Sequence, residues 1–205
     1  MNKTPKPHDL LWGMTPDHLP AGAPAWAVQA LAAGHPVVLR RALCEPGLVA
    51  VGIRGSSREQ RLAATMPIHS IQRLVSPEQL RPRTAAGLPA LRALEAVAPM
   101  LAATGLPWGP TGGVGFQLAT GIAVLHDASD LDLLLRTPTC FDRQHARELL
   151  SALANAPCRI DLQLETPNGA VALREWAGGS RRVLLKCAEG ARLVDNPWLP
   201  LERAA

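Results

Sequence analysis

Two aspartates one residue apart are the side chains of this sequence best suited to chemistry. Asp130 and Asp132 alternate with Leu131, Leu133 and Leu135. Because successive strand residues point to opposite faces, both carboxylates are predicted to project from one face while the leucines enter a core. Like charges this close repel, and a hard divalent cation between them removes the repulsion. The pattern favours a site for Mg²⁺, with Mn²⁺ as an alternative; the competing interpretation is an edge strand with one face in water.

A glycine turn precedes the aspartates. Thr111, Gly112 and Gly113 open a predicted short helix, and the unpaired backbone N–H groups at such a helix start can hold phosphate. A third carboxylate, Asp161, lies on the polar face of a later alternating strand predicted over 159–165. There it can complete the metal site or deprotonate an attacking hydroxyl. Together these groups indicate phosphoryl or nucleotidyl transfer, in which positioning and charge neutralisation supply most of the catalysis.

Positive charge is concentrated in the first part of the chain. Residues 1–84 contain ten Lys or Arg against five Asp or Glu, whereas residues 85–205 contain eleven against twelve. Guanidinium groups pair with phosphate and carboxylate, so this part suits a phosphate-rich ligand or an acidic partner protein; the alternative is a solvated surface. The candidate substrate-binding residues are Arg54, Arg58 and Arg61, together with Arg136 and Lys186 at the ends of predicted strands.

Composition argues against several classes of protein. The chain has no Tyr, two Phe and only three lysines, so the basic and aromatic surface of a single-strand nucleic-acid binder is missing. No run of eighteen apolar residues and no apolar signal region is present, which predicts no membrane association and a cytoplasmic location. The four cysteines are far apart, which favours reduced thiols over a disulfide framework or a zinc site.

The elements that must position these residues fall into two predicted parts, a basic N-terminal α+β domain over 1–84 and a catalytic domain over 85–205. A segment rich in Pro and Arg, 81–87, is predicted to link them. The first part is expected to contain an irregular arm to about residue 22, a helix over 25–33, strands over 37–41 and 48–54, a short helix over 58–65 and a helix start at 76–79.

The second part carries the clearer helical patterns. Apolar residues at helical spacing predict helices over 89–103 and 142–155. Strands are expected over 122–125 and at the aspartate pair, followed by the 159–165 strand, a helical turn over 173–177 and a closing hairpin over 182–194. The predicted fold class is α+β, a mixed sheet with helices on one face.

The second part resembles the polymerase-β-type nucleotidyltransferases. The resemblance rests on the Gly112-Gly113 turn, the Asp130-Leu131-Asp132 pair between apolar residues and the later Asp161. Sixteen residues separate Gly113 from Asp130, more than is usual in that superfamily. The likeness implies a polymerase-β-like catalytic domain in which Asp130 and Asp132 are the catalytic pair that binds Mg²⁺, and in which Asp161 is a third catalytic carboxylate.

A closer resemblance covers nearly the whole chain. It is carried by Pro7-His8-Asp9-Leu10-Leu11-Trp12, by residues 51–55, 60–61, 106–112 and 129–133, and by Asp195-Asn196-Pro197-Trp198. These segments are similar to the malonate decarboxylase holo-acyl-carrier-protein synthases, which are phosphoribosyl-dephospho-CoA transferases. The resemblance implies that a serine of the apo acyl-carrier subunit attacks 2'-(5''-triphosphoribosyl)-3'-dephospho-CoA and that diphosphate leaves.

Two other functions remain open on the sequence. The first is a different nucleotidyltransferase of the same fold that modifies a small molecule or another protein. The second is a non-catalytic module that binds the carrier protein. The basic residues of the first part suit either the polyphosphate of the nucleotide or an acidic carrier, and the sequence does not distinguish the two.

Overall fold

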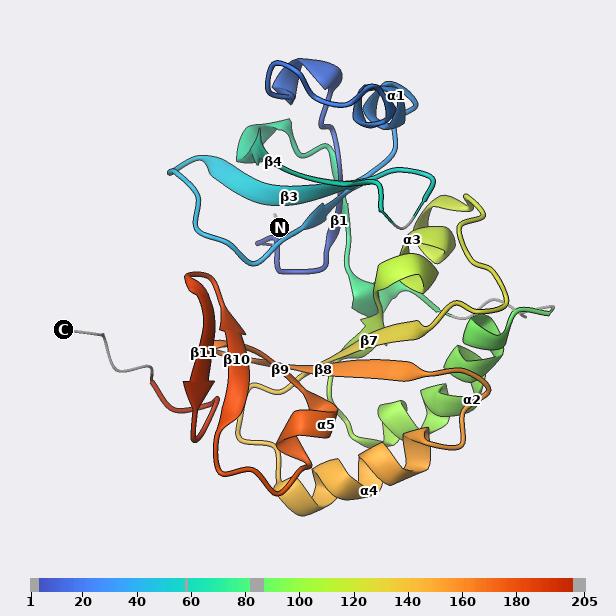
Figure 1. The fold of residues 1–205 in the computed structure, drawn as a ribbon, viewed down its shortest axis with the longest axis vertical. Helices are drawn as coiled ribbons and strands as arrows, with labels where there is room; N and C mark the ends of the chain where they lie inside the picture. The colour runs from blue at the N-terminus through green and yellow to red at the C-terminus, as the bar shows by residue number, and fades with distance from the viewer. Residues whose placement is uncertain (1–3, 58, 82–86, 201–205) are drawn as a thin grey trace.

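Each part of the chain builds its own sheet and its own hydrophobic core. The computed structural model describes residues 4–57, 59–81 and 87–200. Leu11, Val37 and Met66 belong to the core of the first part, and Leu131 and Leu133 to the core of the second. Two separate cores define two domains, which are stacked so that one sheet faces the other (Figure 1). The predicted α+β class is confirmed.

The N-terminal domain is an antiparallel sheet with short helices. The strand order is β4-β3-β2-β1-β5, and α1 packs over one face. Its elements are β1 (Leu10–Trp12), η1 (Pro16–His18), α1 (Ala25–Ala32), β2 (Val37–Leu39), β3 (Leu48–Arg54), β4 (Arg61–Pro67), η2 (Ile68–Ser70) and β5 (Arg73–Val75). A 3-10 turn, η3 (Pro77–Gln79), follows the last strand and contacts the second sheet.

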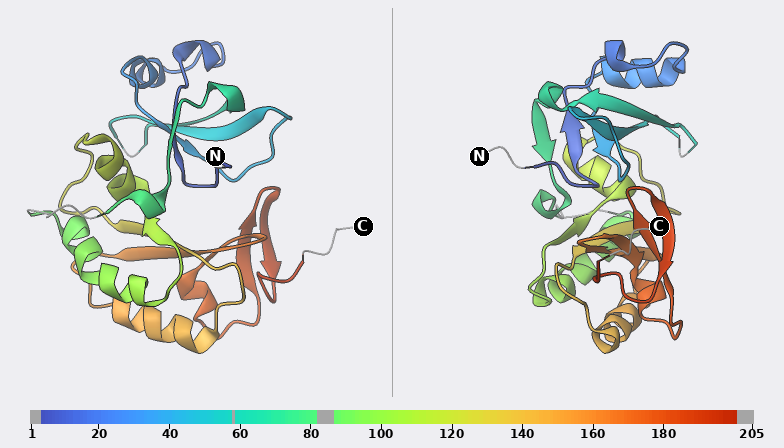
Figure 2. Two further views of the ribbon diagram at one scale, coloured as in Figure 1. Left: turned by 180° about the vertical axis from the view of Figure 1, so that it is seen from behind. Right: turned by 90° about the vertical axis from the view of Figure 1, so that its left-hand side faces the viewer.

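The second domain is a mixed sheet in the order β11-β10-β9-β8-β7-β6, with β7 and β8 parallel and the other pairs antiparallel. Helices α2, α4 and α5 cover the face turned away from the N-terminal domain (Figures 1 and 2). Its elements are α2 (Pro89–Ala103), β6 (Trp108–Pro110), α3 (Gly112–Thr120), β7 (Leu131–Arg136), α4 (Arg143–Leu153), β8 (Ile160–Thr166), β9 (Gly169–Ala172), α5 (Leu173–Trp176), β10 (Val183–Cys187) and β11 (Gly190–Val194).

Local sequence patterns explain the predictions that hold. Leu131, Leu133 and Leu135 are almost fully buried, as the alternation predicts for the strand that carries Asp132. Helix α4 begins where Asp142 accepts hydrogen bonds from the backbone N–H groups of the next turn. Helices α1, α2 and α4 and the closing hairpin of β10 and β11 confirm the corresponding predictions within one or two residues. None of the helices in the described part of the chain is long and apolar enough to cross a membrane.

Several local predictions are wrong. The supposed irregular arm contains β1, which lies between β2 and β5 because its leucines complete the core of the first sheet. The predicted helix over 58–65 is instead β4, although Arg58 lies outside the described residues. Residues 122–125 form a loop rather than a strand, and the capping pattern at 76–79 starts only a 3-10 turn. For β1 and β4, pairing with other strands of the first sheet overrides a short local signal.

The domain boundary predicted at residue 84 remains a prediction. The first sheet ends at Val75 and α2 begins at Pro89, while residues 82–86 lie outside the described part of the chain.

Only part of the polar face of β8 is exposed to solvent. Glu165, expected to point outward, is buried because this face of the sheet packs against the N-terminal domain.

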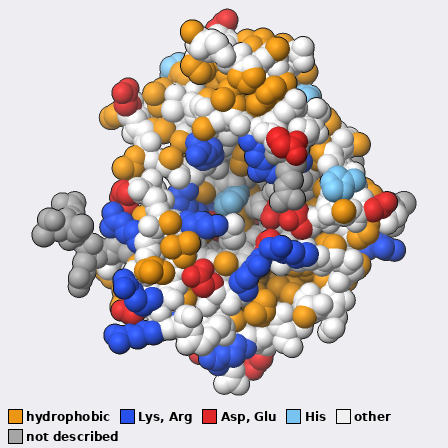
Figure 3. All heavy atoms as spheres, in the orientation of Figure 1, with side chains coloured by type: hydrophobic (Ala, Val, Ile, Leu, Met, Phe, Trp, Pro, Cys, Tyr) orange, Lys and Arg blue, Asp and Glu red, His pale blue; other side chains and the backbone are white. Residues whose placement is uncertain are grey.

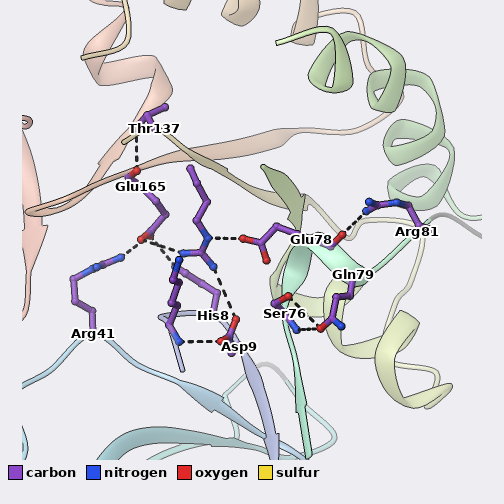
Figure 4. Close-up of polar contacts among 11 residues, drawn as sticks. His8, Asp9, Arg41, Ser76, Glu78, Gln79, Arg81, Thr137 and Glu165 are labelled. Carbon is purple, nitrogen blue, oxygen red and sulfur yellow. Dashed lines mark hydrogen bonds and ion pairs between the residues drawn. The ribbon is translucent and has the colours of Figure 1, made fainter. Parts of the chain in front are cut away.

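A cluster of charged and polar side chains joins the two domains (Figure 4). Glu165 of β8 pairs with Arg41 and lies 3.5 Å from Nε2 of His8. Arg136, at the end of β7, pairs with Glu78 of η3 and lies 3.8 Å from Glu165. We call these residues, together with Asp9, the interdomain cluster. They join the segments around β1, β2 and η3 to the carboxyl ends of β7 and β8.

The pKa values of two carboxyl groups in this cluster are lowered. Burial alone would raise the pKa of Glu165, but the hydrogen bond from His8 and the positive charge of Arg41 outweigh it. Burial also opposes ionisation of Glu78, whose pKa is lowered by its hydrogen bond and ion pair with Arg136. Both groups are therefore held as carboxylates in the folded protein.

This arrangement predicts an acid-sensitive protein. A carboxyl group whose pKa is lower in the folded state stabilises the fold above its unfolded-state pKa, about 4.3 for Glu, and loses this contribution as pH falls through the folded-state value. Glu165→Gln should therefore lose less unfolding free energy than the wild type between about pH 5 and pH 3, measured by urea unfolding at several pH values. Exposed Glu148 of α4 provides the control, Glu148→Gln, which should parallel the wild type. Equal pH dependence of all three proteins would contradict the prediction.

Candidate active site

Three carboxylates meet at the start of the two parallel strands. Asp130 immediately precedes β7, Asp132 is its second residue, and Asp161 is the second residue of β8. The parallel register places Asp132 directly opposite Asp161. One oxygen of each side chain lies within 4.8 Å of the others, and all three residues are half-buried. These three residues, the carboxylate trio, offer the hard oxygen ligands that a divalent cation such as Mg²⁺ prefers.

The glycine turn lies against the trio, as the sequence predicts. Gly112 opens α3 with a φ of +56°, in the left-handed region, and a Cβ built there would lie 2.0 Å from Oδ2 of Asp132. The backbone N–H of Thr111 donates to the carbonyl of Asp132 across 2.8 Å, which fixes the helix start to β7. Only glycine therefore allows this close approach between the first turn of α3 and the aspartate carboxylate.

The trio opens into a polar cavity of about 640 Å³ between the two domains. The second domain contributes Gly113, the loop after α3 and the three aspartates, and the N-terminal domain contributes the ends of β3 and β4 and the turn that joins them. Figure 3 shows a hollow between the domains with basic side chains around it. The polar cavity is lined by Arg54, Ser56, Ser57, Glu59, Arg61, Gly113, Val124, Leu125, His126, Ala128, Ser129, Asp130, Asp132 and Asp161.

Two arginines of the N-terminal domain face the carboxylates. Arg54 ends β3 and Arg61 begins β4, and the two are direct partners in the antiparallel ladder. Burial lowers the pKa of Arg54, the charge of Arg61 lowers it further, and Asp132 opposes both effects. Among the described residues, Nε of Arg54 is buried and has no hydrogen-bond partner. An anionic ligand would neutralise the two like charges and accept a hydrogen bond from the unpartnered Nε.

Asp161 differs from the other two carboxylates in its ion pairs. Arg174 of α5 contacts Oδ1, and Nη2 of Arg159 lies 3.0 Å from Oδ2. These contacts hold the side chain in place at the mouth of the polar cavity. They also engage both of its oxygens with guanidinium groups.

A second cavity, of about 480 Å³, adjoins the first. Arg54, Arg61 and Asp132 line both cavities, so Asp132 is accessible from both. The second cavity has a more apolar lining from β2, β3 and β4 and from Phe116 of α3. Its walls are His8, Val38, Arg40, Gly52, Ile53, Arg54, Arg61, Leu62, Ala63, Thr111, Gly112, Phe116, Asp132 and Gln163.

The structure brings most of the predicted site residues together. Asp130, Asp132, Asp161, Thr111, Gly112, Gly113, Arg54 and Arg61 all line one or both cavities. Arg136 and Lys186 line neither: Arg136 belongs to the interdomain cluster, and Lys186 lies on β10, three strands away from β7. Arg58 lies outside the described residues.

Sequence patterns did not single out the neutral residues that complete the walls. Ser56, Ser57 and Gln163 reach the cavities only because the two sheets face each other, and the same packing brings in Arg40, one of the basic residues of the first part. The loop after α3, which makes the connection to Asp130 long, also lines the polar cavity. Gln117 holds that loop by accepting hydrogen bonds from the backbone N–H groups of Val124 and Leu125.

Fold and site show a two-domain α+β protein with three carboxylates at the domain boundary. The family models for phosphoribosyl-dephospho-CoA transferase MdcG match almost the whole chain, the N-terminal model over residues 6–77 and the C-terminal model over residues 76–197. The chain therefore belongs to the phosphoribosyl-dephospho-CoA transferase family.

Individual relatives agree with the family models. A phosphoribosyl-dephospho-CoA transferase of Pseudomonas putida (strain W619) is 63% identical over 201 residues, which cover 98% of each chain. A protein of the same name from Pseudomonas fluorescens (strain Pf0-1) is 57% identical over 206 residues, which cover 100% of each chain. Another, from Azotobacter vinelandii, is 57% identical over 201 residues, which cover 95% of this chain and 94% of the relative. No solved structure matches the chain.

Proposed function

We propose that this transferase attaches the phosphoribosyl-dephospho-CoA prosthetic group to a serine of the apo acyl-carrier subunit of malonate decarboxylase. The donor is 2'-(5''-triphosphoribosyl)-3'-dephospho-CoA, and diphosphate is released. One observation carries the proposal: a cavity between the domains places two arginines opposite a carboxylate trio and a glycine helix start. The name shared by the relatives, phosphoribosyl-dephospho-CoA transferase, supports the choice of transferred group.

The carboxylate trio supports a divalent cation, Mg²⁺ with Mn²⁺ as an alternative. Asp130 and Asp132 would hold it, and Asp161 is close enough to complete the set. When bound, such a cation neutralises phosphate charge and so favours departure of diphosphate. The oxygen-only ligand set and the half-buried position fit this assignment. The same features support placing the second domain among the polymerase-β-type nucleotidyltransferases.

The chain's own groups would bind and orient the polyphosphate. Arg54 and Arg61 supply positive charge on one side of the polar cavity, and the first turn of α3 supplies backbone N–H groups on the other. Ser57 of the β3–β4 turn adds a hydroxyl donor, whereas the hydroxyl of neighbouring Ser56 donates to Oε1 of Gln60. This arrangement holds the reacting phosphorus near Asp132, where the polar cavity and the second cavity meet.

A mass measurement tests the proposal. The protein is mixed with apo carrier subunit, triphosphoribosyl-dephospho-CoA and Mg²⁺, and the carrier is analysed for the mass of the phosphoribosyl-dephospho-CoA adduct on its serine. The expected result is complete conversion of the carrier, with release of diphosphate measured in parallel. Absence of the adduct would overturn the proposal. Adduct on another acceptor would instead support a different nucleotidyltransferase, and carrier binding without turnover would support a non-catalytic module.

Half-buried Arg54, with its unpartnered Nε, predicts a binding defect. Arg54→Gln should raise the KM for the nucleotide by roughly 10- to 100-fold, because a hydrogen bond to a charged group contributes about 1.5–3 kcal/mol. The matched control is Arg73→Gln, on β5, whose side chain stacks on Trp12 and lines neither cavity. Steady-state kinetics would show the shift in KM. An unchanged KM in Arg54→Gln would remove Arg54 from the nucleotide site.

A further inference from the structure

His8 occupies an unusual position in the N-terminal domain. Its ring lines the second cavity, which also contains Asp132. Among the described residues it is the one non-glycine residue with positive φ, at +75°. Such a conformation costs free energy, and strained backbone positions cluster at active sites and ligand-binding segments. The turn is held by hydrogen bonds from the N–H of His8 to the carbonyl of Leu39 and from the N–H of Lys6 to the carboxylate of Asp9.

The ring of His8 is oriented by a buried carboxylate. Nε2 lies 3.5 Å from Oε1 of Glu165, whose side chain is 6% exposed. The lowered pKa of Glu165 keeps that carboxyl ionised, and an ionised acceptor favours a proton on Nε2. The neutral ring then has its lone pair on Nδ1. Within the described part of the chain, no hydrogen bond engages Nδ1 of His8.

The trio itself has no equally suitable base. Asp161, which the sequence offered for deprotonation of the acceptor, has both oxygens engaged by Arg159 and Arg174. Asp130 and Asp132 are the residues assigned to the cation. A histidine whose second nitrogen is held by a carboxylate is, in contrast, a common arrangement for a general base.

We propose that the second cavity admits the acceptor hydroxyl and that His8, oriented by Glu165, is its general base. This inference rests on the proposed function and adds a catalytic residue from the N-terminal domain. Nδ1 takes the proton of the serine hydroxyl while the serine oxygen bonds to the phosphorus attached to the ribose. The bond from this phosphorus to the bridging oxygen breaks, and the electron pair leaves with diphosphate. Glu165 is a positioning residue that stabilises the imidazolium.

The spacing along β8 is compatible with this division of roles. Asp161 and Glu165 are four residues apart, about 13 Å at the usual rise of a strand, and Gln163 lies between them in the cavity wall. That length accommodates one phosphate group and the attacking oxygen between the trio and the imidazole.

The charged groups around His8 are Glu165, Arg41 and Arg136 of the interdomain cluster and Arg40, Arg54, Arg61 and Asp132 across the second cavity.

Chemical rescue tests the proposal. His8→Gly suits the positive φ, which glycine adopts without strain, and leaves space for free imidazole. We expect kcat for adduct formation to fall by about 10²- to 10³-fold, the KM for the nucleotide to change less than about threefold, and added imidazole to restore much of the rate. His8→Asn, which also tolerates positive φ, should show the same loss. The control is exposed His145→Gly on α4, with wild-type kcat and no response to imidazole.

Two outcomes would overturn the assignment. The first is a kcat of His8→Gly or His8→Asn within about threefold of the wild type; the second is a loss that imidazole does not restore in a protein with an unchanged unfolding temperature. NMR of the imidazole nitrogens gives a readout independent of turnover: His8 should carry its proton on Nε2, and Glu165→Gln should remove this preference. A wild-type enzyme that forms no adduct would instead refute the proposed function, so the two failures are distinguishable.

Discussion

Asp132→Asn is expected to reduce the rate of adduct formation by about 10³-fold or more while the protein stays folded. The substitution keeps the shape of the side chain and removes its negative charge. Asp132 is the residue shared by the trio, both cavities and the contact with Gly112, so its charge acts at the centre of the site. Loss of several kcal/mol of charge stabilisation in the transition state corresponds to this reduction.

Single-turnover kinetics and Mn²⁺ binding followed by electron paramagnetic resonance would check the prediction. Asp127→Asn is the matched control, because Asp127 is exposed in the loop before β7 and lines neither cavity. The control should bind Mn²⁺ and turn over as the wild type does. If Asp132→Asn retained both its rate and its Mn²⁺ affinity, the assignment of a cation to the trio would be wrong.

Gly112→Ala should reduce kcat by about 100-fold with a smaller effect on stability. The new Cβ would lie 2.0 Å from Oδ2 of Asp132 and less than 3 Å from its Cγ, so the carboxylate must move. A displacement of about 1 Å at a reacting centre can cost about two orders of magnitude in rate. The positive φ adds a backbone cost of roughly 1–2 kcal/mol in the folded state.

A substitution at Gly121 separates the displacement of Asp132 from the backbone cost of positive φ. It ends α3 with a φ of +77°, and a Cβ built there meets nothing within 4 Å. Gly121→Ala should therefore lower the unfolding temperature about as much as Gly112→Ala does, but leave kcat near the wild-type value. Equal losses of kcat in both variants would show that the effect comes from the backbone of α3 and not from Asp132.

Residues close together in the sequence determined the most reliable predictions. The alternation around Asp130 and Asp132 predicts a strand with one buried face, because period-two burial is a property of each strand by itself. Apolar spacing predicts α2 and α4 for the same reason. The glycine pair before a helix predicts a turn that can hold phosphate beside the aspartates, and the structure places Gly112 against Asp132.

Contacts between distant segments determined which residues from the rest of the chain reach the aspartate pair. Asp161 joins the pair only through the parallel register of β7 and β8, and Arg54 and Arg61 reach it only because the first sheet stands over the second. Arg136, expected at phosphate, is drawn into the interdomain cluster by Glu78 and Glu165.

Neighbouring residues therefore specify which side chains can do chemistry and which secondary structure carries the aspartate pair. Which side chains share the cavities depends on how the two domains pack, and this packing brought His8 beside Glu165 from the opposite domain. Domain packing and strand register depend on the complementarity of whole surfaces, which no short pattern contains.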